Sequence, residues 1–571
     1  MGWRRARGRI RAPVVELWGP SHMIKLMQFL AGALVIASCA PAIAPCGPAS
    51  CEGGCCDSRG VCVAGRTKTL CGVGGATCSS CEGALQCVAG ACVMPPMDAG
   101  VDVDAGVQDA GEAPLDAGQL RTVRVRRTDE ALLPDGGVRV TQFNLATAVN
   151  QRLLYEDGTG EWIEVMPTES GLELRYDGIP VGPYVLARGF EYVVSDADDF
   201  ELGARTLGKR DRVISGLNTT LSLELQAVPR GARGDFIGVT SFGSGTTADF
   251  LRLPPPNDAG TSTATTDLVT AVQPFGMSGA DGDELTAVLR RNVSDGGPVW
   301  SAAIASGTVT APELASQQTA MTTVTLTPLA QELHPVTVRS SDFEQFAAEV
   351  HPNAVPASTQ ASVSSFLAPP RRPTTGGDFV GQSMLLASSL LLSGRGDLSA
   401  PLTFGRPFGD APLLVEGRLT VTVPLALSGR SLNRSVDALL TTRADGGVLD
   451  VTLTPPRFVR INGESATINR AGVGLTPVLE WAQPALGTPG SFVVTILKVT
   501  PQGTTLNESF AAQIRTPFSR LKVPPFALAR GEAYFALISA ITTTGFDPRR
   551  YGFHSEREFG RATAATAIFT P

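Results

Sequence analysis

Residues 528–540 read Leu-Ala-Arg-Gly-Glu-Ala-Tyr-Phe-Ala-Leu-Ile-Ser-Ala. From residue 534 onward every second residue is apolar, and side chains two residues apart lie on one face of a β-strand. We therefore predict a strand in which Tyr534, Ala536, Ile538 and Ala540 face a hydrophobic core. Two earlier segments, 477–481 (Pro-Val-Leu-Glu-Trp) and 492–499 (Phe-Val-Val-Thr-Ile-Leu-Lys-Val), indicate further strands at this end of the chain.

These segments together resemble a fibronectin type III domain, which we assign to residues 456–571. The resemblance implies that Trp481 is the core tryptophan of an early strand. It also implies that Leu528 and Tyr534 form the leucine and tyrosine-corner pair at one end of a sandwich. Phe492 stands where that family usually has tyrosine. Trp481 could instead line a sugar site, but core packing is the preferred interpretation.

A second segment, 172–186 (Leu-Glu-Leu-Arg-Tyr-Asp-Gly-Ile-Pro-Val-Gly-Pro-Tyr-Val-Leu), predicts a strand, a turn and a strand. Gly182 gives the turn conformational freedom, and Tyr184 returns to the core. The segment resembles carboxypeptidase-regulatory-like and other transthyretin-like sandwiches. The resemblance implies a β-sandwich over residues 121–228.

The rest of the chain also favours β structure. Asp-Gly-Gly stands between alternating segments at 135–137, 295–297 and 445–447, which predicts three hairpins. We assign β-rich domains to 229–334 and 335–455, and expect 413–425 to form one long strand or a hairpin. The predicted fold class is mainly β: several tandem β-sandwich domains (immunoglobulin-like or fibronectin III-like) after a small disulfide-rich module and an acidic linker.

One helix is expected, over residues 341–350. Ser341-Asp-Phe-Glu344 has the pattern of a capping box, and Phe343 shares one helical face with residues 346, 347 and 350. Pro352 ends it. The apolar stretch 384–392 is too short to cross a bilayer as a helix.

All 11 cysteines of the chain lie between Cys39 and Cys92. The module at 46–93 has few large apolar residues, so we expect crosslinks to constrain it. It resembles the cysteine-rich, knottin-like modules at the base of bacterial surface lipoproteins. A redox pair at Cys78 and Cys81, or a zinc site, remain alternatives, although the module has no βαβ context and no histidine. The expected disulfide cysteines, whose pairing the sequence leaves open, are Cys46, Cys51, Cys55, Cys56, Cys62, Cys71, Cys78, Cys81, Cys87 and Cys92.

Residues 1–38 read as a signal region that starts at Met23, with an apolar run at 26–36 and small residues before Cys39. The run Leu-Val-Ile-Ala-Ser-Cys at 34–39 resembles a bacterial lipobox. The resemblance implies diacylglycerol on the sulfur of Cys39, so that membrane lipid is a partner of the chain. Ala40, rather than aspartate, follows the cysteine, which favours the outer membrane. Ordinary cleavage that leaves Cys39 free is the alternative.

Residues 94–120 form a predicted disordered acidic linker with four Asp-Ala-Gly repeats, at 98–100, 104–106, 109–111 and 116–118. Like charges repel, so we expect an extended stalk with a span of about 30 Å or more. A calcium-binding repeat is the alternative.

The composition excludes some functions. The formal net charge is −7, and no basic cluster in the predicted domains suits a nucleic-acid backbone. The length suggests about three to five domains. Only His334, His351 and His554 follow the signal region, and no catalytic or phosphate-binding motif is present. We therefore predict a protein that is not an enzyme and needs no cofactor.

Some short motifs have weaker interpretations. Asp196, Asp198 and Asp199 are weak calcium candidates, with a solvated acidic turn as the preferred interpretation, and Asp281 and Asp283 are treated alike. The Arg-Gly-Asp tripeptides at 233–235 and 395–397 are interpreted as turns.

The predicted function is binding, adhesion or scaffolding by a lipid-anchored protein of the outer membrane or cell surface, with an unidentified envelope or surface ligand. Two alternatives remain. One is a secreted hydrolase or carbohydrate-active enzyme with its site in 229–455. The other is a carbohydrate-binding module, which predicts an exposed row of aromatic side chains; the aromatic content is 6%.

Overall fold

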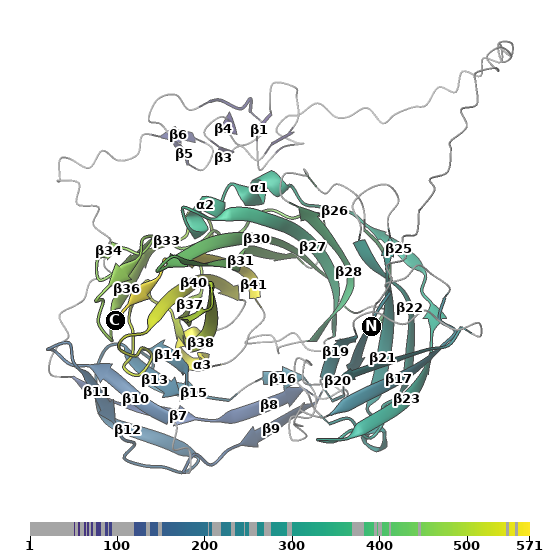
Figure 1. Cartoon of the computed structure of the whole chain (residues 1–571), viewed down its shortest axis with the longest axis horizontal. Coiled ribbons are helices and arrows are strands. Elements are labelled where there is room, and N and C mark those ends of the chain that lie inside the picture. The colour runs from purple at the N-terminus through teal and green to yellow at the C-terminus, as the bar shows by residue number, and fades with distance from the viewer. Residues whose placement is uncertain are drawn as a thin grey trace, which may run out of the picture. The chain divides into compact units, whose positions relative to one another are not determined.

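A computed structural model divides the chain into two compact units, Met1–Gly106 and Val107–Pro571 (Figure 1). In the first unit it describes residues 51, 55–56, 62–63, 66–67, 70–71, 76–80, 86–88 and 91–93. In the second it describes residues 119–132, 137–146, 151–203, 205–207, 219–229, 235–241, 243–244, 246–250, 260–267, 276–293, 300–367, 382–392, 397, 402–409, 411, 413–443, 447–543, 547–553 and 558–571. The predicted signal region and most of the acidic linker lie outside these residues.

The predicted fold class is confirmed, because strands dominate the described residues and helices are short. In the described ranges no helix combines the length and apolar character needed to cross a membrane. The first unit contains three short antiparallel pairs: β1 (Cys55–Cys56) with β2 (Cys62–Val63), β3 (Arg66–Thr67) with β4 (Leu70–Cys71), and β5 (Gln86–Val88) with β6 (Ala91–Val93).

The first part of the second unit has two layers of strands around a buried cluster. One layer is β12-β7-β15, and the other is β11-β10-β13-β14. Tyr184 lies in the cluster between them, as predicted. The predicted strand–turn–strand forms β12 and β13, which lie in different layers, and Gly182 between them has φ of 140°. The strands are β7 (Leu120–Arg126), β8 (Thr128–Leu132), β9 (Val138–Gln142), β10 (Gln151–Glu156), β11 (Trp162–Val165), β12 (Glu173–Pro180), β13 (Tyr184–Arg188), β14 (Glu191–Ser195), β15 (Asp199–Glu201) and β16 (Arg205–Leu207).

A second buried cluster lies among the strands that follow. The three-stranded sheet β20-β17-β23 supplies one side of it, and β18, β21 and β22 supply the other. The elements are β17 (Thr220–Gln226), β18 (Phe236–Ser241), β19 (Thr246–Phe250), β20 (Ser262–Asp267), the 3-10 helix η3 (Gly279–Asp281), β21 (Glu284–Val293), β22 (Trp300–Thr310), β23 (Thr319–Thr325) and β24 (Thr327–Pro328).

Residues 331–448 contain the longest strands. The apolar segment at 413–425 forms one long strand, which was one of the two predicted outcomes. Ser428 and Gly429 then both have positive φ, as a type I′ hairpin turn requires. The elements are β25 (Gln331–His334), β26 (Val336–Thr337), α1 (Ser340–Glu344), α2 (Ala347–Val350), β27 (Val355–Leu367), β28 (Gln382–Leu392), β29 (Leu402–Gly405), β30 (Leu413–Leu427), β31 (Arg430–Arg443) and β32 (Gly447–Val448).

The C-terminal part packs the sheet β34-β33-β36-β39 against β38-β37-β40-β41. The core positions predicted on β40 are confirmed, since residues 534, 536, 538 and 540 are all buried. Trp481 is buried too, with its ring 5.2 Å from that of Phe492. The elements are β33 (Arg457–Ile461), β34 (Glu464–Ser465), β35 (Arg470–Ala471), β36 (Val478–Ala482), β37 (Ser491–Gln502), β38 (Thr505–Thr516), β39 (Arg520–Lys522), β40 (Ala533–Thr543), α3 (Pro548–Tyr551), β41 (Glu558–Ala565) and β42 (Phe569–Thr570).

Two of the three predicted hairpins are confirmed. β8 pairs with β9 around residues 135–137, and β21 pairs with β22 around 295–297, both antiparallel. The third, at 445–447, is wrong. β32 pairs in parallel with β26, and the side of β31 that a returning strand would need is partly occupied by β41.

The predicted helix is also wrong in its length and its cap. The segment breaks into α1 and α2, and the N-cap of α1 is Arg339, with no side-chain cap hydrogen bond. Ser341 already lies inside the first turn, so its hydroxyl cannot act as the cap. Asp342 forms an ion pair with Arg339 at 2.8 Å instead. The predicted buried face persists, because Phe343, Ala347 and Val350 are all buried.

Backbone pairing joins these sandwiches into one sheet, which the sequence did not predict. Among the described residues, neighbouring strands follow the order β11-β10-β13-β14-β38-β37-β40-β41-β31-β30-β27-β28-β22-β21-β18-β19. Figure 1 shows the C-terminal strands between the first strands of the unit and the long strands β30 and β27. The largest buried cluster accordingly contains residues from Leu154 to Phe569. The boundaries drawn at 228, 334 and 455 stay predictions.

Candidate interaction surface

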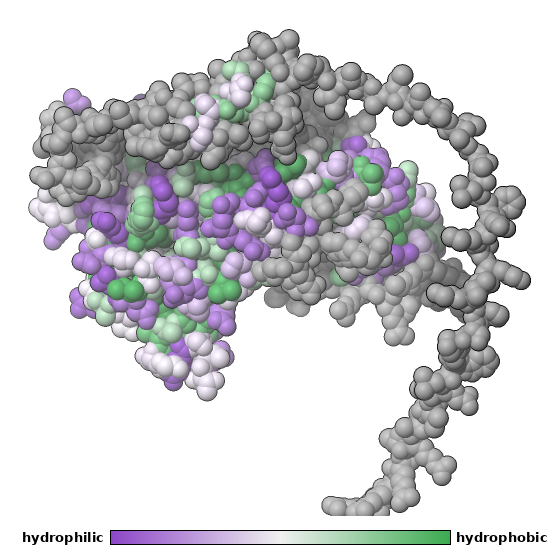
Figure 2. All heavy atoms as spheres, turned by 90° about the horizontal axis from the view of Figure 1, so that it is seen from above, coloured by the Kyte–Doolittle hydropathy of each residue, from purple (hydrophilic) through white to green (hydrophobic). Residues whose placement is uncertain are grey.

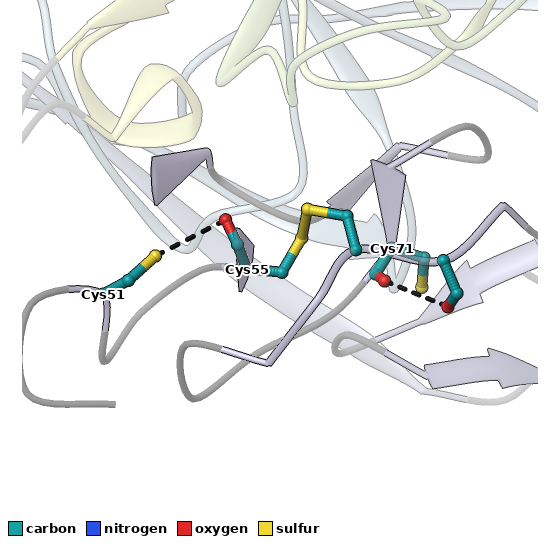
Figure 3. The surroundings of a disulfide bond; sticks show 5 residues. Cys51, Cys55 and Cys71 are labelled. Carbon is teal, nitrogen blue, oxygen red and sulfur yellow. Dashed lines mark hydrogen bonds between the residues drawn. A yellow bond between two sulfur atoms is a disulfide. The ribbon is translucent and has the colours of Figure 1, made fainter. Parts of the chain in front are cut away.

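The cysteine-rich module contains a disulfide between Cys55 and Cys78 (Figure 3). Cys51, Cys56 and Cys71 are also disulfide-bonded. The sulfur of Cys51 lies 3.5 Å from the carbonyl oxygen of Cys55. Since Cys78 is bonded to Cys55, it is not paired with Cys81, so this state contains no Cys78–Cys81 redox pair. Cys39, Cys46 and Cys81, and the side chains of Cys62, Cys87 and Cys92, lie outside the described residues.

The acidic cluster predicted as a weak calcium candidate faces arginines. Asp196 lies 3.4 Å from Arg549, and Asp198 lies 3.2 Å from Arg121. Asp199 lies 3.6 Å from Arg126. Within the part of the chain that the structure describes, no group of three or more His, Cys, Asp or Glu side chains is placed to hold a metal ion. The three aspartates of the cluster therefore form ion pairs with arginines of the same chain.

The second acidic candidate, Asp281 with Asp283, stabilises a loop. The carboxylate of Asp283 is buried and accepts a hydrogen bond from the backbone N–H of Ser278 at 2.9 Å. It also lies against Gly243, where a side chain would collide with it. Asp281 is exposed beside it. This geometry holds the turn before β21.

The acidic cluster lies where the C-terminal part docks on the first sandwich. The hydroxyl of Ser195 donates to the carbonyl oxygen of Arg549 at 2.5 Å. The ring of Phe553, just after α3, lies 5.8 Å from that of Phe200, and Gly552 lies against Val193. A segment of the C-terminal part thus completes the core of the first sandwich.

Two further contacts hold the same junction. β14 pairs in parallel with β38, with Glu191 opposite Gln513. Lys522 forms an ion pair with Glu156 at 2.7 Å and lies 5.9 Å from the ring of Trp162. Nothing in the local sequence of either segment signals these pairings.

The two described histidines contact backbone, aromatic and acidic groups. His334, on β25, stacks on Phe404 at 4.6 Å and lies 3.4 Å from Glu332. His351 follows α2, and its Nδ1 accepts a hydrogen bond from the backbone N–H of Asn353 at 3.1 Å. Among the described residues neither histidine is hydrogen-bonded to a serine, threonine or cysteine side chain. His554 lies outside the described residues.

His351 should make stability depend on pH. Its side chain is 3% exposed, and this burial lowers its pKa because the charged ring would lose hydration. The unfolded chain takes up this proton near pH 6.5, and the folded chain does so only at lower pH, so stability falls as pH drops below about 6.5. We expect thermal unfolding to show a steeper loss from about pH 7 to about pH 5 for the wild type than for His351→Gln. Equal slopes would contradict this assignment.

The first Arg-Gly-Asp tripeptide does not present its carboxylate. Asp235 is buried and forms an ion pair with Arg291 at 2.8 Å. Of the second tripeptide only Asp397, which is exposed, lies in the described residues. The carboxylate of Asp235 thus makes a contact within the chain, and the turn predicted at 233–235 stays a prediction because residues 233 and 234 lie outside the described residues.

Exposed phenylalanines are the surface feature that sequence reasoning missed. Phe526 is 69% exposed with φ of 75°, and Phe458 is 73% exposed with φ of 53°. Positive φ is rare for aromatic residues and marks positions that the surrounding structure holds in place. Arg152 covers one face of Phe526 at 5.3 Å. In Figure 2 hydrophilic residues in purple are interspersed with small green hydrophobic groups on the face displayed.

The described surface exposes no tryptophan or tyrosine side chain among its large hydrophobic residues. Its exposed aromatic residues are phenylalanines, whereas Trp300 and Trp481 are buried and Trp162 is partly buried. The interpretation of Trp481 as a core residue is thus confirmed.

No protein-family model and no curated protein matches the chain. Among solved structures, it is similar to a putative cell adhesion protein from Parabacteroides distasonis, at 9% identity over 52% of this chain and 98% of that chain, with a TM-score of 0.13. It is also similar to a streptococcal ancillary pilin, at 9% identity over 58% of this chain and 98% of that chain, with a TM-score of 0.10. A tetra-tandem repeat from a large adhesion protein gives 11% identity over 77% and 99%, with a TM-score of 0.10. TM-scores this low do not establish a shared fold or function.

Proposed function

We propose that this chain is a non-catalytic, lipid-anchored protein of the bacterial cell envelope that binds or scaffolds a surface ligand through its β domains. The disulfide between Cys55 and Cys78 is the observation that carries the proposal. Disulfides persist mainly outside the reducing cytosol. They therefore support export, in agreement with the signal region predicted at 1–38, just before Cys39.

The binding or scaffolding role is supported by the form of the β unit. Its sandwiches share a hydrogen-bonded sheet, so they provide a rigid support for exposed groups such as Phe526 and Phe458. The described histidines make no hydrogen bond to a serine, threonine or cysteine side chain within the described residues. Charged candidates such as Asp196 and Asp235 form ion pairs with arginines. These features favour recognition over catalysis.

The C-terminal domain is proposed to be fibronectin III-like. Two sheets of order β33-β36-β39 and β38-β37-β40-β41 support this proposal. A tyrosine-corner contact supports it as well, because the hydroxyl of Tyr534 accepts a hydrogen bond from the backbone N–H of Ala529 at 2.9 Å. For the first sandwich, the transthyretin-like proposal is supported by β12 and β13, which cross between layers at Gly182.

The anchor predicts a direct result. Cys39→Ala should abolish incorporation of labelled palmitate and release the protein from membranes, because the acyl chains provide the hydrophobic attachment. Ala44→Ser, outside the lipobox, is the matched control and should stay labelled and membrane-bound. An unlabelled wild type, or a Cys39→Ala protein that still fractionates with membranes, would contradict the anchor.

The cysteine-rich module predicts a second result. If Cys39 is acylated and the ten cysteines that follow are paired, the mature protein has no free thiol. Alkylation under denaturing conditions should then label no cysteine before reduction and all ten after it. Labelling before reduction would show that part of the module is reduced or binds a metal.

A further inference from the structure

β23 is an edge strand without the usual protection against pairing. It reads Thr-Ala-Met-Thr-Thr-Val-Thr, with no charge and no proline, and β-branched residues dominate it. It pairs with β17 on one side, and within the described residues no strand pairs with its other side. Unprotected edges of this kind can accept a strand from another chain.

The hydrogen bonds at the two ends of β23 show which backbone groups face the open edge. The carbonyl of Gln318 accepts from Thr220, and the N–H of Leu326 donates to Gln226, so even-numbered residues bond to β17. In a parallel ladder alternate residues point to opposite sides. The N–H and C=O groups of Thr319, Met321 and Thr323 therefore point outward.

Three other edge strands of the unit contain charged residues. β9 contains Arg139, β11 contains Glu164 and β20 contains Asp267. Such charges disfavour pairing with a further strand. β23 instead exposes Met321, whose side chain is 64% exposed.

We propose that β23 is a homotypic docking edge, at which the β23 strand of a second copy adds in antiparallel orientation with Met321 on the two-fold axis. The carbonyl of Thr325 lies against Gly307 of β22, so the open part of the edge is 319–323, and Met321 is its centre. In this register Met321 faces its own copy and Thr319 faces Thr323.

A second copy fits this edge for three reasons. The outward-pointing residues of one strand meet outward-pointing residues of the other, so each facing pair can exchange two hydrogen bonds. An uncharged strand opposes no like charges to itself, and Thr–Thr and apolar cross-strand pairs are favourable. An interface repeated by a two-fold axis must be self-complementary, and this strand meets that condition.

The contact should be weak in dilute solution. One strand edge of 7 residues buries less than the about 800 Å² per partner of a standard stable interface. Copies held on the same membrane would meet at a higher effective concentration. The docking edge itself does not depend on the anchor at Cys39.

The first test places a cysteine on the proposed axis. Cα atoms of a hydrogen-bonded antiparallel pair lie about 5.5 Å apart, within the range of a disulfide. Full-length protein with Met321→Cys should therefore form a covalent dimer under mild oxidation on intact membranes. Met166→Cys should form no such dimer; Met166 is 73% exposed and follows β11 in the first sandwich. A covalent product that contains a different protein would overturn the homotypic assignment.

The second test introduces repulsion. Met321→Lys places two like charges opposite each other, so the dissociation constant of the dimer should rise at least about tenfold, by sedimentation of the full chain over a range of concentrations. Met166→Lys should behave as the wild type, and both variants should keep the wild-type melting temperature because both sites are exposed. A wild type that stays monomeric at all concentrations, together with no crosslink at position 321, would overturn the proposal.

Discussion

Phe535→Ala is expected to lower the free energy of unfolding by about 3–5 kcal/mol, which is a large part of the about 5–15 kcal/mol typical of a folded protein. Phe535 lies on β40, on the face opposite Tyr534, and is 0% exposed. Removing the ring leaves a cavity in the largest buried cluster, at a strand paired on both sides by β37 and β41. Urea unfolding followed by tryptophan fluorescence measures the loss.

A surface phenylalanine provides the control. Phe510 on β38 is 51% exposed, so Phe510→Ala should change stability by no more than about 0.5 kcal/mol. Should Phe535→Ala be as stable as Phe510→Ala, the second face of β40 would not be packed against a core.

Gly552→Ala is expected to open the junction between the C-terminal part and the first sandwich. Gly552 has φ of −60°, which alanine adopts freely, so the effect arises from space alone. The added methyl group would meet both methyl carbons of Val193 and lie 2.9 Å from the carbonyl oxygen of Pro548. We expect a loss of about 1–3 kcal/mol and faster proteolysis near α3.

Two variants isolate this clash. Gly171→Ala, at a glycine with nothing within 4 Å of the added atom, should be neutral. In a Val193→Ala background the cost of Gly552→Ala should shrink, because the opposing methyl groups are gone. If the cost were the same in both backgrounds, Val193 would not be the residue that meets the new methyl group.

The local features of the fold could be predicted from the sequence. The alternation at Tyr534 and Ile538 and the turn glycine at 182 predict structures that are present. The apolar segment at 413–425, predicted as a long strand or a hairpin, forms a long strand. Each of these predictions depends on residues close together in the chain. A period of two shows which side chains share a face, but not whether the other face is also covered. The burial of Phe535 was therefore invisible.

Several misses share one cause, which is a partner far along the chain, whereas the helix predicted at 341–350 fails locally because its first turn begins at Ser340. The hairpin at 445–447 fails because β32 pairs with β26 instead. At 196–199 the preferred prediction was a solvated acidic turn, with calcium as a weak candidate, and the ion pair of Asp196 with Arg549 was missed because Arg549 lies far along the chain. Pairing of β14 with β38 leaves no mark in either strand, so the predicted domains had no reason to be joined.

The hydrogen bond between Ser195 and Arg549 joins positions 354 residues apart, so there is a delay during synthesis before it can form. At about 5–20 residues per second, the ribosome reaches Arg549 roughly 20 to 70 s after it has added Ser195. Until then the nascent chain holds the strand edge of β14 and the apolar ring of Phe200 without their final cover. A chaperone that binds these exposed groups during synthesis would keep the incomplete sheet from aggregating.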